Sequence, residues 1–380
     1  MTTSNQGDTL NAHPDLIVEG FHGPGGLAEG RRILGLRTRA VGMEWDAAAC
    51  ATAKAAGHTV VRCDVATMPT APFRGRVKIK VDSPPCQAWS DAGKREGLID
   101  QPLVHQAVED LARGRDTRAR LLTACKDKRS LLAAEPMRWH HDLRPETIVM
   151  EEVPRVLPLW QQYARVLRAW GYSVWVGVLN AADYGVPQTR RRAILIASLV
   201  RDVAPPAPTH TEHPAGEDLF GDNLPGWVTM AEALHLETGI DVITRGNRKT
   251  PGGNAFPADA PSWALTEKAP SWVLHSRRDS PAWIAAHGAR ENRTGAQPAP
   301  SITGEAHRWY WTADGDLRRP LSLAEAATLQ SFPADHPWHG ARTRQFLQVG
   351  NAVPPLLAAH VLSAATGIPM PVAADLRAAA

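Results

Sequence analysis

The 380-residue sequence predicts an α/β protein, in which a doubly wound, mostly parallel sheet is followed by a smaller, loop-rich second domain. Two observations favour this class. Short β-rich runs alternate with helical patterns over residues 15–204, which is the order that builds a parallel sheet covered by helices. A proline-rich segment at 204–210, APPAPTH, then ends the alternation, and helical periodicity is poor from 205 to 315.

The first domain is expected to contain alternating strands and helices in a single sheet. We predict strands at residues 15–18, 38–43, 58–62, 77–81, 147–150, 173–178 and 193–197. We predict helices at residues 26–34, 47–56, 118–134 and 159–169. Because ligands bind outside the carboxyl ends of the strands in such sheets, the residues that follow each strand are the candidates for a site.

Two further segments flank these domains. Residues 1–14 are expected to be a flexible N-terminus, and they lack the basic and apolar regions of a secretory signal. Residues 316–380 regain helical character and are expected to pack back on the first domain. Ser322 with Glu325 three residues later has the pattern of a capping box, and prolines open a closing helix at 354–366.

The composition excludes several classes of protein. No apolar run approaches the roughly 20 residues of a membrane span, so we expect a cytoplasmic protein. The four cysteines show no CxxC spacing, so neither a metal site nor a disulfide framework is expected. The net charge is only +3, but residues 202–241 carry eight acidic and no Lys or Arg residues, whereas 244–293 carry eight basic and four acidic ones.

The ends of the first three predicted strands favour a nucleoside cofactor. A Gly-Pro-Gly-Gly turn at 23–26 opens the first helix, where a ligand can approach the backbone closely. Glu44 follows the second strand, as carboxylates that bind ribose hydroxyls do, and Trp45 offers a face for stacking. Asp64 follows the third strand and is placed to accept from an exocyclic amine. A tight turn without any ligand is the alternative for the glycine segment.

The fourth strand ends in Ser-Pro-Pro-Cys-Gln at 83–87, which predicts a nucleophile at Cys86. Two prolines make a rigid turn that would hold one thiol at the edge of the sheet. A buried Cys that acts as a small apolar residue is the alternative, and it fits Cys50, Cys63 and Cys125 better.

Charged residues mark the last two strands of the same edge. Glu151 and Glu152 end the fifth predicted strand, and only one of two adjacent carboxylates can face the site. Arg190 and Arg192 alternate to one face before the strand at 193–197 and would bind a phosphate or a polarised carbonyl. Solvated surface acids and a basic edge strand are the respective alternatives.

The order of these motifs resembles the DNA (cytosine-5) methyltransferase family over nearly the whole chain. The matching segments are FHGPGGLAEG, GMEWD, CDV, SPPCQAWS, EEVP, ADYGVPQTRRR, LQSFP and QVGNAVPP. The resemblance implies a Rossmann-like, S-adenosylmethionine-binding catalytic domain at 15–204. It also implies a target-recognition domain at 205–315 and C-terminal helices at 316–380 that complete the cofactor pocket.

The resemblance assigns roles to individual residues. Cys86 would attack C6 of a cytosine flipped out of the duplex, Glu151 would hold N3, and Arg192, supported by Arg190, would contact the base carbonyl. S-adenosylmethionine, with S-adenosylhomocysteine as product and no metal, would contact Phe21, Gly23, Gly25, Gly26, Glu44, Trp45, Asp64, Pro84, Asn351 and Val353.

The resemblance implies a monomer whose partner is double-stranded DNA. A cognate restriction endonuclease is a second partner in some systems of this family. Contacts to DNA are expected from Gln87, Ser90, Lys94, Arg245, Arg248, Lys249, Arg277 and Arg278. The first three belong to segments at and after the nucleophile, including a mobile catalytic loop expected at 88–98. Residues 113–129 carry seven basic residues, which either track the DNA backbone or form an ordinary solvated helix face.

Two departures from the family pattern leave alternatives open. Glu152 stands where the family usually has Asn, and His22 replaces a small residue or Cys. A catalytically impaired DNA-binding homologue and the same chemistry on tRNA are therefore alternatives to an active DNA methyltransferase.

Overall fold

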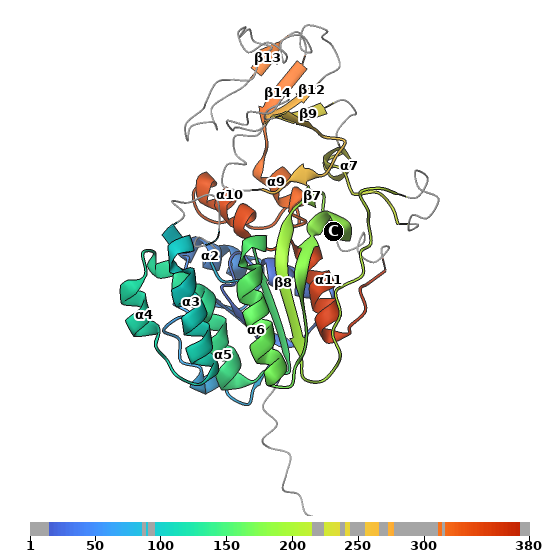
Figure 1. The fold of residues 1–380 in the computed structure, drawn as a ribbon. Helices are drawn as coiled ribbons and strands as arrows, with labels where there is room; N and C mark the ends of the chain where they lie inside the picture. The colour runs from blue at the N-terminus through green and yellow to red at the C-terminus, as the bar shows by residue number, and fades with distance from the viewer. Residues whose placement is uncertain are drawn as a thin grey trace, which may run out of the picture.

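The computed structural model describes residues 15–85, 89, 96–214, 224–235, 240–243, 255–265, 273–276, 311–313 and 316–372. A large α/β domain carries a small β domain at one end (Figure 1). Among the described residues, no helix is long and apolar enough to cross a membrane.

The large domain is built on a seven-stranded sheet in the order β3-β2-β1-β4-β5-β8-β6. Its strands are β1 Leu16–Gly20, β2 Arg39–Glu44, β3 Val60–Arg62, β4 Val77–Asp82, β5 Thr147–Glu152, β6 Ser173–Asn180 and β8 Arg191–Ser198. All neighbouring pairs are parallel except that β8 runs antiparallel to both β5 and β6. The predicted fold class and all seven predicted strands are confirmed.

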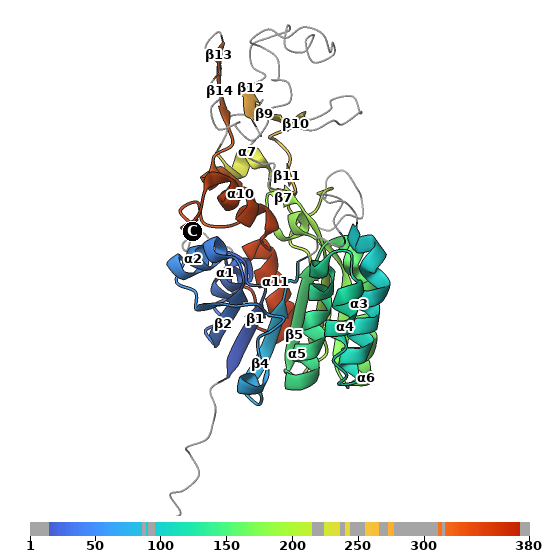
Figure 2. The same ribbon diagram turned by 90° about the vertical axis from the view of Figure 1, so that its left-hand side faces the viewer.

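Helices cover both faces of this sheet, as the doubly wound prediction requires. They are α1 Gly26–Ile33, α2 Ala47–Ala55, α3 Glu96–Ala112, α4 Arg118–Ala124, α5 Glu135–Leu143, α6 Leu157–Ala169 and α11 Pro355–Thr366. Strand β5 makes the division clear, because Ile148 and Met150 pack in the core under α3, α5 and α6. Val149 points the other way, into the core under α1 and α11. Figure 2 shows the two helical layers on either side of the strands.

The predicted single helix at 118–134 is wrong. Helix α4 ends at Ala124, and a 3₁₀ helix, Lys128–Ala134, follows after a break. The carboxylate of Asp100 in α3 accepts hydrogen bonds from the backbone N–H groups of Lys126 and Asp127 at 2.8 and 2.9 Å. It also accepts one from the hydroxyl of Ser130 at 2.8 Å. Tertiary bonds to a buried carboxylate therefore replace the helical bonds that periodicity alone predicts.

Helices near the end of the chain return to the large domain, as expected. Helix α9, Leu323–Leu329, begins with the predicted capping box between Ser322 and Glu325. Helix α11 has Pro355 in its first turn and packs along α1. Helices α3, α5 and α10 (Arg342–Asn351) were not predicted.

The small domain contains a five-stranded antiparallel sheet in the order β10-β9-β12-β14-β13. Its strands are β9 Ile240–Ile243, β10 Ala255–Pro257, β12 Val273–Ser276, β13 Trp311–Ala313 and β14 Asp316–Pro320. The expectation of an irregular domain missed this sheet, and β14 extends it beyond the predicted boundary at 315. The sheet lies beyond the carboxyl ends of the parallel strands, with α9 and α10 between them (Figures 1 and 2).

A short parallel ladder joins the two domains. Strand β7, Gln188–Thr189, pairs with β11, Ser262–Trp263. The single-turn helix α7, Met230–Ala233, packs beside α9 and begins with a second capping box, between Thr229 and Glu232.

Candidate active site

The glycine turn lies between β1 and α1 and needs left-handed backbone at three positions. Phe21 and Gly23 both have φ of 58°, and Gly25 has φ of 105°. An added Cβ at Gly23 would meet no atom within 4 Å, so the turn is open on that side. At Gly26 a Cβ would lie 2.2 Å from the carbonyl oxygen of Val353, which explains the glycine there by close approach of two backbones.

Glu44 at the end of β2 fixes this turn. Its Oε2 atom accepts a hydrogen bond from the N–H of Gly23 at 2.7 Å, and its Oε1 atom accepts one from the N–H of Asp46 at 2.7 Å. Trp45 beside it is 70% exposed, so one face of the indole is available for a ligand. Each carboxylate oxygen retains acceptor capacity for a ribose hydroxyl.

Asp64 is the third member of this group, on the segment that follows β3. Its Oδ1 atom accepts a hydrogen bond from the N–H of Ala66 at 2.9 Å, and its carbonyl accepts from the N–H of Met68 at 3.0 Å. Because β3, β2 and β1 are neighbours in the sheet, the structure brings Asp64, Glu44 and the glycine turn to one edge.

Glu151 lies at the end of β5 beside the start of β8. Its Oε1 atom is 3.0 Å from Nε of Arg192, and its Oε2 atom accepts a hydrogen bond from the Ser83 hydroxyl at 2.6 Å. The carboxylate of the adjacent Glu152 accepts from the backbone N–H of Val153 instead. The two adjacent acids therefore have different partners, and the role of Glu151 at a cytosine stays a prediction.

Ser83 is a site residue that sequence reasoning missed. Its hydroxyl is the first polar group after β4, three residues before Cys86, and that position was the available signal. Pro84 follows it and is buried in the same turn.

Several predicted site residues lie outside the described part of the chain. They are Cys86, Gln87, Ser90, Lys94, Arg245, Arg248, Lys249, Arg277 and Arg278. The predicted mobile loop at 88–98 lies mostly there too, but its last three residues belong to helix α3.

Arg190 has partners different from those of Arg192. Its side chain is 2% exposed, and it donates hydrogen bonds to the carbonyl oxygens of Leu265 at 3.3 Å and Ala352 at 3.0 Å. It therefore ties a strand of the catalytic domain to the small domain and to the C-terminal segment. A supporting role at the base through these bonds stays a prediction.

Two buried glutamines, neither of which was predicted from the sequence, add hydrogen bonds where the large domain, the small domain and the C-terminal segment meet. The side-chain amide of Gln188 donates to Oε1 of Gln330 at 2.5 Å, and that of Gln330 donates to the Ala352 carbonyl at 2.7 Å. Oε1 of Gln188 accepts from the N–H of Leu265 at 3.1 Å. These bonds bring the segments QTRRR, LQSFP and QVGNAVPP, far apart in the chain, to one place.

The C-terminal segment reaches the glycine turn through its backbone. Val353 is 5% exposed and lies against Gly26. Asn351 is the last residue of α10 and is exposed.

The unusual His22 is accommodated by a buried partner. Its Nδ1 atom lies 2.8 Å from Oε2 of Glu19, and Arg31 lies 3.5 Å from the other oxygen of that carboxylate. Burial acts to raise the pKa of Glu19, but the charges of His22 and Arg31 outweigh it, so this pKa is lowered. Glu19 therefore stabilises the histidine beneath the glycine turn.

A second buried network lies directly before the Ser-Pro-Pro turn. The Asp82 carboxylate pairs with Lys80, and its Oδ2 atom lies 3.3 Å from Nε2 of His140. Burial lowers the pKa of both Lys80 and His140 in spite of the neighbouring carboxylate. No group of three or more His, Cys, Asp or Glu side chains suited to a metal ion occurs in the part of the chain that the structure describes.

The basic segment at 113–129 is largely neutralised by its own neighbours. Arg113 pairs with Glu109, and Arg115 pairs with Asp110. Arg118 pairs with Asp116 and Glu135, and Arg129 pairs with Asp127. These four arginines therefore have acidic partners within the protein, and a track for the DNA backbone stays a prediction.

The sequence model of the C-5 cytosine-specific DNA methylase family matches residues 17–106 and 118–366, which is most of the chain. The chain belongs to this family. As a family member it is a DNA (cytosine-5)-methyltransferase, and the resemblance read from the eight motifs is confirmed.

Named relatives agree. The chain is 27% identical over 371 residues to the type II methyltransferase M1.HphI of Haemophilus parahaemolyticus, covering 91% of this chain and 85% of that protein. It is 24% identical over 352 residues to the type II methyltransferase M.Eco47II of Escherichia coli, covering 89% and 75%. The crystal structure of the Schizosaccharomyces pombe (S. pombe) Dnmt2 methyltransferase superposes with a TM-score of 0.59 at 15% identity, over 93% of this chain and 98% of that one, which supports the fold.

Proposed function

We propose that this methyltransferase transfers a methyl group from S-adenosylmethionine to C5 of a cytosine flipped out of duplex DNA, through a covalent adduct of Cys86 at C6. The arrangement of Ser83, Glu151 and Arg192 carries the proposal. Cys86 is three residues from Ser83, so its Cα lies within about 11 Å of the Cα of Ser83. The proposal puts the thiol near this carboxylate and guanidinium at one edge of the sheet.

The residues at the ends of β1, β2 and β3 fit S-adenosylmethionine. The open side of Gly23 leaves room for a ligand at the turn, and the carboxylate of Glu44 suits a ribose diol. The exposed indole of Trp45 suits an adenine face, and the carboxylate of Asp64 suits the adenine amine. When bound, S-adenosylmethionine would supply an electrophilic methyl group and remain as S-adenosylhomocysteine.

The side chains of the protein supply the activation of the base. The Cys86 thiolate forms a bond to C6, and the electrons of the C5–C6 double bond move towards N3 and the carbonyl. Glu151 provides the proton at N3 and Arg192 stabilises the negative charge at the carbonyl oxygen, which makes C5 nucleophilic. After C5 is methylated, loss of the C5 proton to a base re-forms the C5–C6 double bond and expels the thiolate, and the N3 proton returns to Glu151. The base has to leave the stack first, at a cost of a few kcal/mol.

Recognition of duplex DNA is assigned to the small domain. The predicted contacts Arg245, Arg248, Lys249, Arg277 and Arg278 belong to it. A restriction endonuclease is a natural partner, because the relatives are named type II methyltransferases.

Trapping the adduct tests the proposal. Duplex DNA carrying 5-fluorocytosine should form a complex with the wild-type protein that survives denaturation, because fluorine at C5 prevents release. Cys86→Ser should form none, whereas the control Cys125→Ser should form it as the wild type does. A complex that maps to Cys125, or one that forms only on tRNA carrying the same base, would overturn the proposal.

A further inference from the structure

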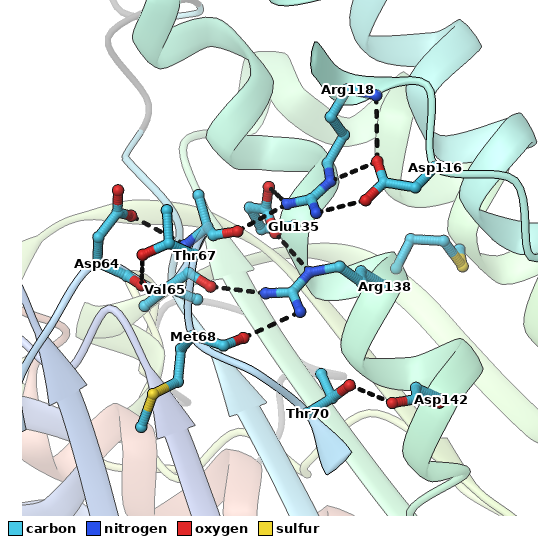
Figure 3. A network of polar contacts seen from close by, with 12 residues as sticks. Asp64, Val65, Thr67, Met68, Thr70, Asp116, Arg118, Glu135, Arg138 and Asp142 are labelled. Carbon is cyan, nitrogen blue, oxygen red and sulfur yellow. Dashed lines mark hydrogen bonds and ion pairs between the residues drawn. The ribbon is translucent and has the colours of Figure 1, made fainter.

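Two arginines from the helical layer hold the segment that carries Asp64. Arg138 in α5 donates hydrogen bonds to the carbonyl oxygens of Val65 at 2.7 Å and Met68 at 3.0 Å. Arg118 at the start of α4 donates to the carbonyl oxygen of Ala66 at 2.9 Å. Figure 3 shows the two guanidinium groups reaching this segment from the same side.

Glu135 forms ion pairs with both arginines. Its Oε2 atom lies 3.1 Å from Nε of Arg138, and its Oε1 atom pairs with Arg118. Burial raises the pKa of Glu135 in spite of both positive neighbours, since its side chain is almost inaccessible to water. Asp116 pairs with Arg118 from the other side, with 2.6 Å between Oδ2 and Nη2. Both guanidinium groups are therefore fixed in orientation before they meet the segment.

Backbone N–H groups of the same segment hold Asp64 in place. The N–H of Ala66 donates to Oδ1 of Asp64 at 2.9 Å, and the N–H of Met68 donates to the Asp64 carbonyl at 3.0 Å. Ala66 and Met68, whose N–H groups donate to Asp64, therefore have their own carbonyl oxygens bound by the two arginines. Moving a carbonyl of this segment would move the donors of Asp64 with it.

We propose that Arg118, Glu135 and Arg138 are positioning residues that fix the Asp64 carboxylate for the adenine amine of the cofactor. This inference rests on the proposed function, because it takes the end of β3 as part of the cofactor site. The bonds run from side chain to backbone, so loss of an arginine should misplace Asp64 without removing any group that touches the ligand. Affinity for the cofactor should fall, and the rate of transfer at saturating cofactor should not.

The test compares Arg138→Met with the matched control Arg115→Met. Arg115 belongs to the same helical layer, but its guanidinium pairs with Asp110 and not with the backbone of the segment at 65–68. Calorimetric titration with S-adenosylhomocysteine should give a dissociation constant about tenfold higher for Arg138→Met, equivalent to the loss of one hydrogen bond to a charged group. Arg115→Met should bind like the wild type, and kcat of both variants at saturating S-adenosylmethionine should stay within about twofold of it.

A double-variant cycle separates positioning from general stability. If Arg138 acts through Asp64, then Asp64→Ala combined with Arg138→Met should bind no more weakly than Asp64→Ala alone. Losses that add in the double variant would overturn the proposal, as would unchanged affinity of a folded Arg138→Met. Should circular dichroism show that Arg138→Met is unfolded, Arg118→Met carries the same cycle with one carbonyl bond removed. A wild-type protein that binds no S-adenosylhomocysteine would instead contradict the proposed cofactor.

Discussion

The Oε1 atom of Glu151 lies 3.0 Å from Nε of Arg192, across the antiparallel pairing of β5 with β8. Glu151 is the penultimate residue of β5 and Arg192 is the second residue of β8, so the antiparallel direction brings a strand end and a strand start to the same edge. Besides this ion pair, Nη1 of Arg192 donates a hydrogen bond to the carbonyl oxygen of Arg191 at 2.7 Å.

Replacing Arg192 by Met should lower kcat by about 10²–10³-fold, because one donor to the developing charge on the base is lost. Steady-state transfer of labelled methyl groups to duplex DNA measures the effect. Arg191→Met is the matched control, since Arg191 is exposed and its neighbour carries the contact to Glu151. Equal losses in both variants would contradict the assignment of Arg192.

Removing the hydroxyl of Ser83 should weaken catalysis more mildly. Ser83→Ala deletes the 2.6 Å hydrogen bond to Glu151 and should cost about 1 kcal/mol, which is roughly a fivefold loss in kcat. Ser363→Ala removes a hydroxyl that donates to the Ile368 carbonyl at the far end of α11, so it should leave kcat unchanged. An unchanged kcat in Ser83→Ala would show that the orientation of Glu151 does not depend on this bond.

Gly26→Ala should destabilise the contact between the glycine turn and the C-terminal segment. The new Cβ would lie 2.2 Å from the Val353 carbonyl oxygen, and overpacking of this kind costs about 1–3 kcal/mol. Thermal unfolding measures the loss. At Gly226 the nearest atom would be 3.6 Å away, so Gly226→Ala should unfold at the wild-type temperature.

Acidification should destabilise the fold through two buried histidines. Burial lowers the pKa of His336 and of His360 from 6.5 to about 4, so the unfolded chain binds more protons than the native one between these values. Their contribution to the free energy of unfolding is fully present above pH 6.5 and is lost as the pH falls towards 4. Each contributes on the order of 3 kcal/mol over that interval.

Chemical denaturation at pH 7, 6, 5 and 4 tests this dependence. His360→Gln should flatten the slope of stability against pH, because the replacement does not titrate. His213 is exposed, so His213→Gln should keep the wild-type slope. A slope that is identical in His360→Gln and the wild type would contradict the prediction.

The sheet was predictable because each strand is a short β-rich run between clear breaks. β4 (VKIKVD) and β5 (TIVMEE) are buried almost throughout, as strands covered on both faces are, although each carries three polar or charged residues. The side chains at the strand ends, Glu44, Asp64 and Glu151, followed from the rule that parallel strands present their carboxyl ends to one site.

The helices that were missed have sequences that oppose the usual signals. Helix α10 begins with two arginines and no side-chain cap, although a helix N-terminus favours negative charge. Helix α3 contains Pro102. These helices are stabilised by packing, for example by Phe346 of α10 in the core shared with α9, and packing is not visible in local sequence.

The small sheet and the arginine contacts were hidden for a related reason. The strands of the small sheet are three to five residues long, and β9 pairs with β12 about 30 residues further along the chain. Sequence alternation placed Arg190 and Arg192 on one face, but alternation does not say which backbone carbonyls a guanidinium will reach.

The carbonyl of Val353 buttresses a turn made 327 residues earlier, at Gly26. During synthesis at about 5–20 residues per second, the ribosome therefore exposes the glycine turn roughly 16–65 s before the segment that packs against it is made. A nascent chain passes that interval with the turn uncovered on one side. The packing of the glycine turn against the C-terminal segment is for this reason completed only after residue 353 has been made.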